Sequence, residues 1–148
     1  MKSQKELILI TGGVRSGKSA YAQRLAIEKG GKTLFLATAQ AGDADMAQRI
    51  ALHKTSRPEE WLTVEEPLHI AQAFSQHSHE SEVVILDCLT LWVSNHLLQL
   101  FAEGTEVKAD ESTQRGTIKE AEAFLKAYQK GSASLIVVTN EVGMGIVP

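Results

Sequence analysis

The sequence has 148 residues, of which 43% are hydrophobic and 22% are charged, as in an ordinary globular protein with a core of its own. The formal net charge of -3 argues against the basic surface on which nucleic-acid binding depends, so we expect no nucleic-acid partner. No apolar run reaches the roughly 18 residues of a membrane-spanning helix. The single cysteine, Cys88, excludes an internal disulfide, so a cytoplasmic location is expected.

The first expected element is a buried strand at residues 6–11, and a helix is expected at residues 18–29. The segment that follows the strand and includes the first two residues of the helix is Gly12-Gly13-Val14-Arg15-Ser16-Gly17-Lys18-Ser19. It fits the phosphate-binding loop pattern. In such a loop, backbone N–H groups and the first helical turn bind phosphate oxygens. The lysine reaches the β and γ phosphates, and the serine hydroxyl is suited to Mg²⁺. The alternative is a glycine-rich turn that binds nothing; the context favours nucleotide binding.

The middle of the chain alternates strands and helices. A second buried strand is expected at residues 33–37, and the residues after it should lie near the ligand, because parallel sheets bind at the carboxyl ends of their strands. A helix is expected from Asp43 to about Thr55, a short strand at residues 61–65 and a helix at about residues 68–76. The polar residues 76–81 are expected to form a loop.

The next strand, residues 83–87, is apolar and ends in Asp87. A continuous apolar run suits a parallel strand that is covered on both faces. An acid at its carboxyl end is what a Walker B position looks like, where it holds Mg²⁺ directly or through water. The alternative is an aspartate that caps the next helix. Together with the phosphate-binding loop, the pattern favours the metal role for Asp87.

The last third begins with a strongly apolar helix at residues 89–101, which must be buried in the core or in a subunit interface. A loop is expected at residues 102–116 and a strand at residues 135–139. Between them a helix is expected at residues 117–130. Its core side would carry Ile118, Ala121, Phe124, Leu125 and Tyr128. The predicted fold is an α/β domain of the P-loop NTPase type spanning residues 1–148, with a mainly parallel sheet and helices on both faces.

Three segments resemble one enzyme family closely. They are Asp45–Pro58, which contains Arg-x-x-x-His-Lys-x-x-Arg-Pro; Leu86–Asn95; and Val138–Pro148, which contains Asn-Glu-Val-Gly-Met-Gly-Ile-Val-Pro. With the phosphate-binding loop, they resemble the bifunctional adenosylcobinamide kinase/adenosylcobinamide-phosphate guanylyltransferase family of cobalamin biosynthesis. The resemblance runs from Leu7 to Pro148. In that family a further helix and a final strand follow this last segment, so the chain is expected to be C-terminally shortened.

The resemblance implies two activities at one site. The first is phosphorylation of the aminopropanol hydroxyl of adenosylcobinamide, a corrinoid, by ATP or GTP. The second is transfer of GMP from GTP to that phosphate through a guanylylated histidine, and His53 is the matching residue. A neutral imidazole nitrogen is a competent nucleophile toward phosphorus. A solvated surface histidine is the alternative for His53 on its own. The resemblance also implies a homo-oligomer, the trimer of the family.

By the same matching, further residues are expected at the nucleotide. The catalytic residues would be His53 and Lys18, and the metal ligands Ser19 and Asp87. The nucleotide-binding residues would be Gly12, Gly13, Val14, Arg15, Ser16, Gly17, Lys18, Ser19, Thr38, Ala39, Lys54, Thr55, Ser56, Arg57, Glu65 and Asp87. Glu65 fits a reader of the guanine N1–H and amino group, and equally fits a solvated surface acid.

Two other functions stay open at this point. One is a P-loop kinase for another small alcohol, which would form no guanylylated histidine. The other is a nucleotide-binding remnant without turnover.

Overall fold

The computed structural model describes residues 4–13, 17–39, 57–102 and 111–140. Within these residues, five parallel strands form one sheet in the order β1-β5-β4-β2-β3. The strands are β1 (Leu7–Gly12), β2 (Thr33–Ala37), β3 (Leu62–Glu65), β4 (Val83–Asp87) and β5 (Ser134–Asn140). The helices are α1 (Lys18–Lys29), α3 (Ile70–His77), α4 (Leu89–Ala102) and α5 (Glu111–Lys130), with the short 3₁₀ helix η1 (Ser78–Glu80). The predicted α/β fold with a mainly parallel sheet is confirmed.

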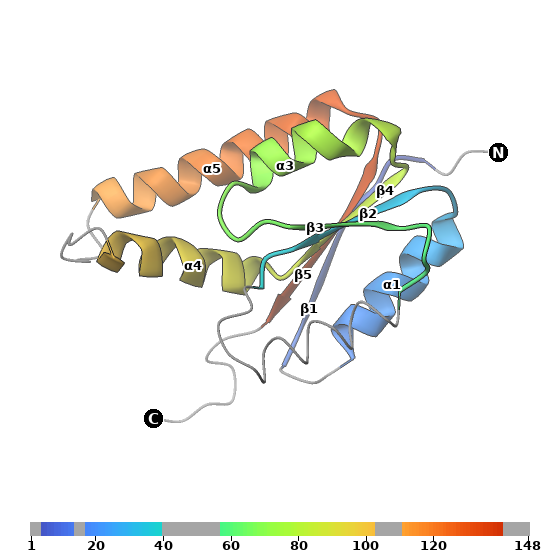
Figure 1. Cartoon of the computed structure of the whole chain (residues 1–148), viewed down its shortest axis with the longest axis horizontal. Helices are drawn as coiled ribbons and strands as arrows, with labels where there is room; N and C mark the ends of the chain where they lie inside the picture. The colour runs from blue at the N-terminus through green and yellow to red at the C-terminus, as the bar shows by residue number, and fades with distance from the viewer. Residues whose placement is uncertain (1–3, 14–16, 40–56, 103–110, 141–148) are drawn as a thin grey trace.

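Helices lie on both faces of the sheet, with α1 on one face and α3, α4 and α5 on the other (Figure 1). Alternate residues of the central strands therefore enter two different cores, as expected for a pleated sheet buried on both sides. The α1 core includes Phe35, Ile85 and Ile136. The opposite core includes Trp92 and a perpendicular pair of rings, Phe74 and Phe124, with centroids 5.3 Å apart.

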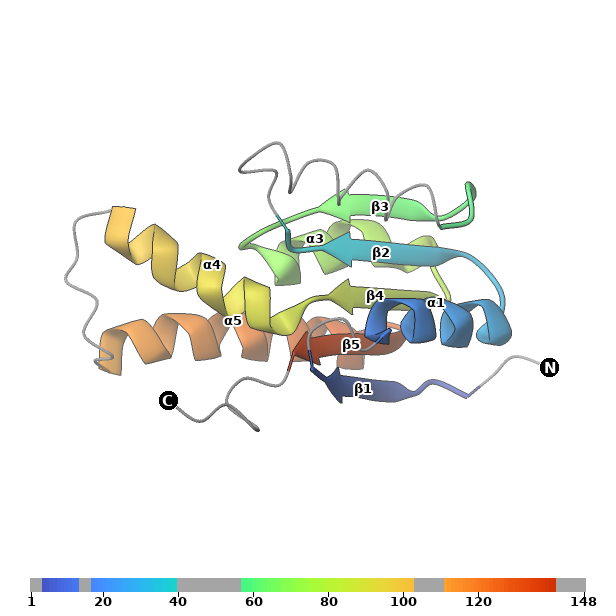
Figure 2. The same ribbon diagram turned by 90° about the horizontal axis from the view of Figure 1, so that it is seen from below.

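All strands end at the same edge of the sheet, from which α4 extends outward (Figure 2). The register aligns Glu65 of β3 with Ala37 of β2, and Ala37 with Asp87 of β4. Two of the acids singled out in the sequence thus stand in one row, two strand spacings or roughly 10 Å apart at the backbone. Because Asp87 alternates with Ile85, it belongs to the face that α1 covers.

Several predictions of local structure need correction. The loop expected at residues 102–116 is wrong for its second part, because α5 already begins at Glu111 and continues through Gly116. The loop expected at residues 76–81 is wrong as well: His77 ends α3, and η1 follows. The helix expected at Asp43–Thr55 lies outside the described residues.

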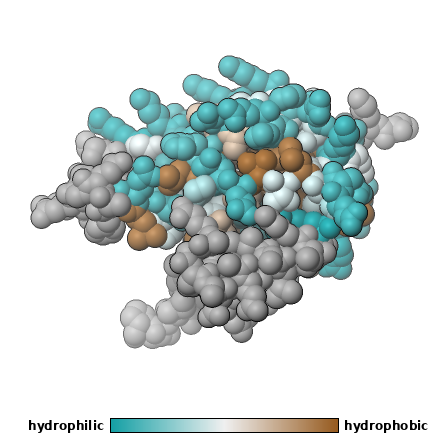
Figure 3. Space-filling model, in the orientation of Figure 1, coloured by the Kyte–Doolittle hydropathy of each residue, from teal (hydrophilic) through white to brown (hydrophobic). Residues whose placement is uncertain are grey.

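Two residues expected on the core side of α5 lie at its surface. Ile118 is 54% exposed and Leu125 is 44% exposed, whereas Phe124 is buried. On α4 the apolar residues divide similarly, because Trp92 is buried and Leu98 is 62% exposed. Figure 3 shows hydrophilic side chains along the outer surface of α5 and hydrophobic ones at the surface near the outer part of α4. None of the helices in the described part of the chain is long and apolar enough to cross a membrane.

Candidate active site

The phosphate-binding loop joins β1 to α1 at the carboxyl edge of the sheet. Gly17 precedes α1 with φ +83°, a left-handed conformation that favours glycine. A methyl group added at Gly13 or Gly17 would meet no described atom within 4 Å, so open space lies over both positions. Lys18 folds back, and its Nζ donates to the carbonyl oxygen of Gly13 at 2.5 Å. The described ends of the loop therefore leave space beside Gly13 and Gly17, with the Lys18 ammonium group bonded to the Gly13 carbonyl oxygen.

The hydroxyl of Ser19, in the first turn of α1, donates to Oδ2 of Asp87 at 2.6 Å. This contact joins two segments 68 residues apart and confirms that the loop and the end of β4 meet. A hydroxyl and a carboxylate at this separation offer two oxygen ligands to a hard cation such as Mg²⁺, with phosphate oxygens and water to complete its shell. The described residues contain no cluster of three or more His, Cys, Asp or Glu side chains that could hold a metal without such help. The donor set thus fits Mg²⁺ that arrives with a nucleotide.

Arg57 provides a half-buried cation on the same face of the sheet. Its guanidinium lies over the ring of Phe35, 3.6 Å from the centroid, and Nη1 donates to Oγ1 of Thr63 at 3.2 Å. Burial lowers the pKa of Arg57 from its ordinary value, while the negative charges of Asp87 and Glu65 act in the opposite direction. Its Nε is buried with no hydrogen-bond partner among the described residues.

Thr38 follows β2 and is fully buried. Its hydroxyl accepts from the backbone N–H of Cys88 at 2.9 Å and donates to the Cys88 carbonyl oxygen at 2.8 Å. The side chain is therefore committed to the backbone, and no atom of Thr38 is exposed to a ligand in this structure. Ala39, the next residue, is partly exposed.

The comparison with known families adds to this geometry. The model of the family described as cobinamide kinase / cobinamide phosphate guanyltransferase matches residues 8–148, nearly the whole chain. The chain belongs to the cobinamide kinase / cobinamide phosphate guanyltransferase family.

Three relatives are named as bifunctional adenosylcobalamin biosynthesis proteins. The Pseudomonas aeruginosa protein CobP is 41% identical over 140 residues, which are 95% of this chain and 74% of that protein. Escherichia coli CobU is 40% identical over 146 residues, covering 96% of this chain and 78% of the relative. Salmonella typhimurium CobU is 38% identical over 143 residues, covering 96% of this chain and 78% of the relative. The expectation of an enzyme of adenosylcobalamin biosynthesis is confirmed.

One solved structure supports the fold alone. The structure of the ATP synthase subunit NeqB from Nanoarchaeum equitans is similar to this one, with a TM-score of 0.57 and 15% sequence identity. The alignment covers 95% of this chain and 40% of the NeqB chain. This similarity agrees with a P-loop NTPase-like fold.

The structure brings together the predicted site residues that it describes. They are Gly12, Gly13, Gly17, Lys18, Ser19, Thr38, Ala39, Arg57, Glu65 and Asp87, and all lie at the carboxyl edge or on the α1 face near it. The remaining predicted residues lie outside the described part of the chain. They are Val14, Arg15, Ser16, His53, Lys54, Thr55 and Ser56.

Sequence reasoning missed three residues that support the site. Phe35 and Thr63 hold Arg57, and Asn95 of α4 is buried with its amide bonded to two backbone carbonyls. A signal existed for two of them. Thr63 alternates with Glu65 and so shares its face, and Asn95 is a polar residue inside an otherwise apolar helix.

Proposed function

We propose that this chain carries two activities at the site described. It phosphorylates the aminopropanol hydroxyl of adenosylcobinamide with ATP or GTP, and it transfers GMP from GTP to the resulting phosphate, giving adenosyl-GDP-cobinamide and pyrophosphate. The observation that supports this most strongly is the contact between Ser19 and Asp87 at the phosphate-binding loop. Membership of the family supports the choice of a corrinoid substrate.

In the first step, the hydroxyl oxygen of the substrate attacks the γ-phosphorus. The bond between that phosphorus and the β–γ bridging oxygen breaks, the nucleoside diphosphate leaves, and the hydroxyl proton passes to water. Lys18 would exchange the Gly13 carbonyl for phosphate oxygens, because that carbonyl is a neutral acceptor and phosphate is an anion. The N–H groups at the start of α1 add to this stabilisation.

Ser19 and Asp87 would hold Mg²⁺ when the nucleotide is bound. The ion supplies positive charge to the phosphate oxygens and fixes their orientation. The hydroxyl proton that now lies between Ser19 and Asp87 must then turn away, since the serine oxygen offers its lone pairs to the cation.

In the second step, a ring nitrogen of His53 attacks the α-phosphorus of GTP and pyrophosphate leaves. A phosphate oxygen of adenosylcobinamide phosphate then attacks the same phosphorus, and the N–P bond breaks. Arg57 would contact the phosphates with its guanidinium group. Lys54, Thr55 and Ser56, the three residues before it in the sequence, would also contact the phosphates. Glu65, aligned two strands from Asp87, would accept from the guanine N1–H and amino group.

We also propose that the protein is a cytoplasmic homo-oligomer, the trimer that the family resemblance implies. The exposed apolar side chains of α4 and α5 support an oligomer, because Leu98 and Ile118 are both more than half exposed in the single chain. The buried free thiol of Cys88 suits a reducing compartment. Sedimentation velocity measures the assembly directly: a single monomeric species at working concentration would contradict it.

Intact-mass measurement after incubation with GTP and Mg²⁺, without corrinoid, tests the proposed intermediate. We expect a gain of one GMP that is labile in acid and that disappears when adenosylcobinamide phosphate is added. His53→Ala should abolish the gain. His79→Ala removes a histidine on the surface of η1 and is the matched control, so its adduct should persist.

Two results would contradict the proposal in different ways. GTP binding without an adduct would reduce the function to that of a small-molecule kinase. Absence of any nucleotide binding would remove both activities.

A further inference from the structure

The peptide that joins Asp87 to Cys88 is held at both of its polar atoms by Thr38. The backbone N–H of Thr38 donates to the carbonyl oxygen of Asp87 at 3.0 Å. The hydroxyl of Thr38 accepts from the N–H of Cys88 at 2.9 Å. A single residue at the end of β2 thereby fixes the direction in which the chain leaves β4, directly after the carboxylate that contacts Ser19.

The hydroxyl of Thr38 both accepts a hydrogen bond from the backbone of Cys88 and donates one to it. Besides accepting from Cys88, it donates to the carbonyl oxygen of Cys88 at 2.8 Å. Thr38 has 0% exposure, so water does not replace either bond. Removing the hydroxyl would leave the buried N–H of Cys88 without a partner, and the backbone would have to shift to satisfy it. The carbonyl oxygen of Cys88 would keep the backbone N–H of Trp92, which donates to it at 3.2 Å.

Asn95 of α4 holds Thr38 in turn. Its side-chain amide donates to the carbonyl oxygen of Thr38 at 2.8 Å and to that of Pro67 at 3.0 Å. Pro67 follows Glu65 by two residues, and Asn95 is only 8% exposed. One buried amide therefore joins the end of β2 to the segment that follows the proposed guanine-reading acid.

We propose that Thr38 and Asn95 are positioning residues of this active site, which act through the backbone to hold Asp87 against Ser19. The inference rests on the proposed role of Asp87 as a ligand of the nucleotide-bound Mg²⁺. It adds that the geometry of that ligand depends on two side chains that need not touch the nucleotide. Side chains that orient a metal ligand typically alter metal affinity by about 10-fold to 100-fold when they are removed.

The affinity of the full chain for a fluorescent N-methylanthraniloyl GTP, measured with and without Mg²⁺, tests this. The quantity compared is the ratio of the two affinities. A partly unfolded variant binds less in both conditions by the same factor, so the ratio reports the site in the folded molecules. We expect Thr38→Val, which keeps the shape and removes the hydroxyl, to lower the ratio by about tenfold.

Two matched variants make the result specific to this hydroxyl. Thr38→Ser keeps the hydroxyl and should retain the wild-type ratio within about twofold. Thr139→Val removes a hydroxyl that contacts Thr90 at 2.8 Å, at the end of the neighbouring strand, and should leave the ratio unchanged. Asn95→Leu should lower the ratio in the same direction as Thr38→Val, because the Thr38 carbonyl loses its donor.

Asp87→Asn separates this inference from the proposed function. If Asp87→Asn leaves the ratio unchanged, the proposed metal role of Asp87 fails, and the inference fails with it. If Asp87→Asn removes the Mg²⁺ effect while Thr38→Val retains the wild-type ratio, only the inference is overturned. If the affinity ratio falls as much in Thr38→Ser as in Thr38→Val, the inference is also overturned, because loss of the hydroxyl would then not explain the lower ratio.

Discussion

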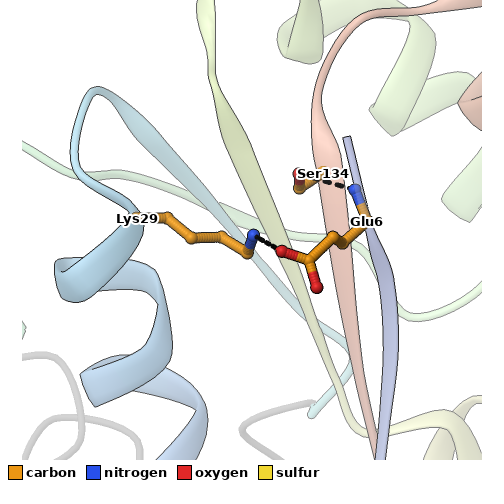
Figure 4. Close-up of polar contacts among 3 residues, drawn as sticks. All are labelled: Glu6, Lys29 and Ser134. Atoms are coloured by element: carbon orange, nitrogen blue, oxygen red, sulfur yellow. Dashed lines mark hydrogen bonds and ion pairs between the residues drawn. The ribbon is translucent and has the colours of Figure 1, made fainter. Parts of the chain in front are cut away.

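The two ends of the parallel sheet carry similar residues in opposite electrostatic settings. At the carboxyl end, α1 begins, and its first residue is Lys18. At the amino end, α1 and α5 finish, and Lys29 and Lys5 lie there. The Nζ of Lys29 contacts Oε1 of Glu6 at 2.6 Å, while the backbone N–H of Glu6 donates to Ser134 (Figure 4). Lys5 donates to the carbonyl oxygens of Tyr128 and Gly131 at the end of α5, at 2.7 and 2.8 Å.

The difference follows from the direction of the helices. A helix has a partial positive charge at its start and a partial negative charge at its end, so a lysine stabilises the fold at the end and opposes the dipole at the start. Lys5 is in the favourable place, whereas Lys18 is in the unfavourable one. A cation kept at a helix start, above a glycine-rich turn, is suited to an anion that comes from outside the protein. If the proposed function is correct, the amino end of the sheet contributes to stability and the carboxyl end binds the ligand.

Lys18→Met is the strongest way to break this comparison. It should lower the affinity for GTP by about 100-fold, the loss expected for charge-assisted hydrogen bonds to phosphate. The melting temperature should stay the same or rise slightly, because a cation at the start of α1 is removed. Calorimetric titration and thermal unfolding measure the two effects. A variant that binds GTP normally would show that the loop at residues 12–19 is not the phosphate site.

Gly31 and Gly17 sharpen the comparison, because both have left-handed φ values, +82° and +83°. An added methyl group at Gly31 would overlap the carboxylate of Glu82, whereas one at Gly17 meets no described atom within 4 Å. Gly31→Ala should destabilise the protein by about 1 kcal/mol because of its left-handed backbone, since the exposed Glu82 side chain can turn away from the added methyl group. GTP affinity should not change. Gly17→Ala should cost about 1 kcal/mol and reduce GTP affinity, because its methyl group enters the space for phosphate.

The double variant Gly31→Ala with Glu82→Ala provides the control for the overlap. Chemical unfolding of the four proteins of this cycle should show additive effects, because the backbone conformation at Gly31 is the main cost and the exposed Glu82 side chain can move. A recovery of stability when the Glu82 side chain is removed would mean that the overlap contributes.

Much of the sheet could be read from the sequence because its signals are local. The bounds of β2 and β4 match the predicted strands at residues 33–37 and 83–87, since both are apolar runs between polar residues. The helix at residues 18–29 ends where Gly30 and Gly31 stop it. The meeting of the loop with Asp87 was also predictable, because parallel strands end at one edge.

The sequence predictions were wrong or incomplete where tertiary contacts determine the local structure or the exposure of a side chain. The start of α5 was missed since Gly116 and its polar neighbours resemble a loop, although a helix tolerates a glycine when the following residues are packed. The exposure of Ile118 was missed because helical periodicity defines a face without saying how far the neighbouring elements cover it. Likewise, the ring of Phe35 beneath Arg57 depends on the pairing of β2 with β3, which local sequence does not report.

Lys5→Met is the mildest test of the same comparison. It removes the cation from the carbonyl oxygens at the end of α5 and from the face of the Tyr128 ring, whose centroid lies 4.2 Å from Nζ. We expect a loss of about 1 kcal/mol in the free energy of unfolding, measured by chemical denaturation, because the site is exposed and water replaces part of the interaction. Added salt should narrow the difference from wild type, since exposed charges are screened.

Lys32→Met, at another exposed lysine near the amino end, is the matched control for Lys5→Met and should change stability by less than about 0.5 kcal/mol. GTP affinity should be unchanged in both variants. A loss of GTP affinity in Lys5→Met would mean that the amino end influences the ligand through the length of α5 or β1. The separation of roles between the two ends would then be wrong, because a cation that stabilises a helix end would also be acting on the nucleotide site.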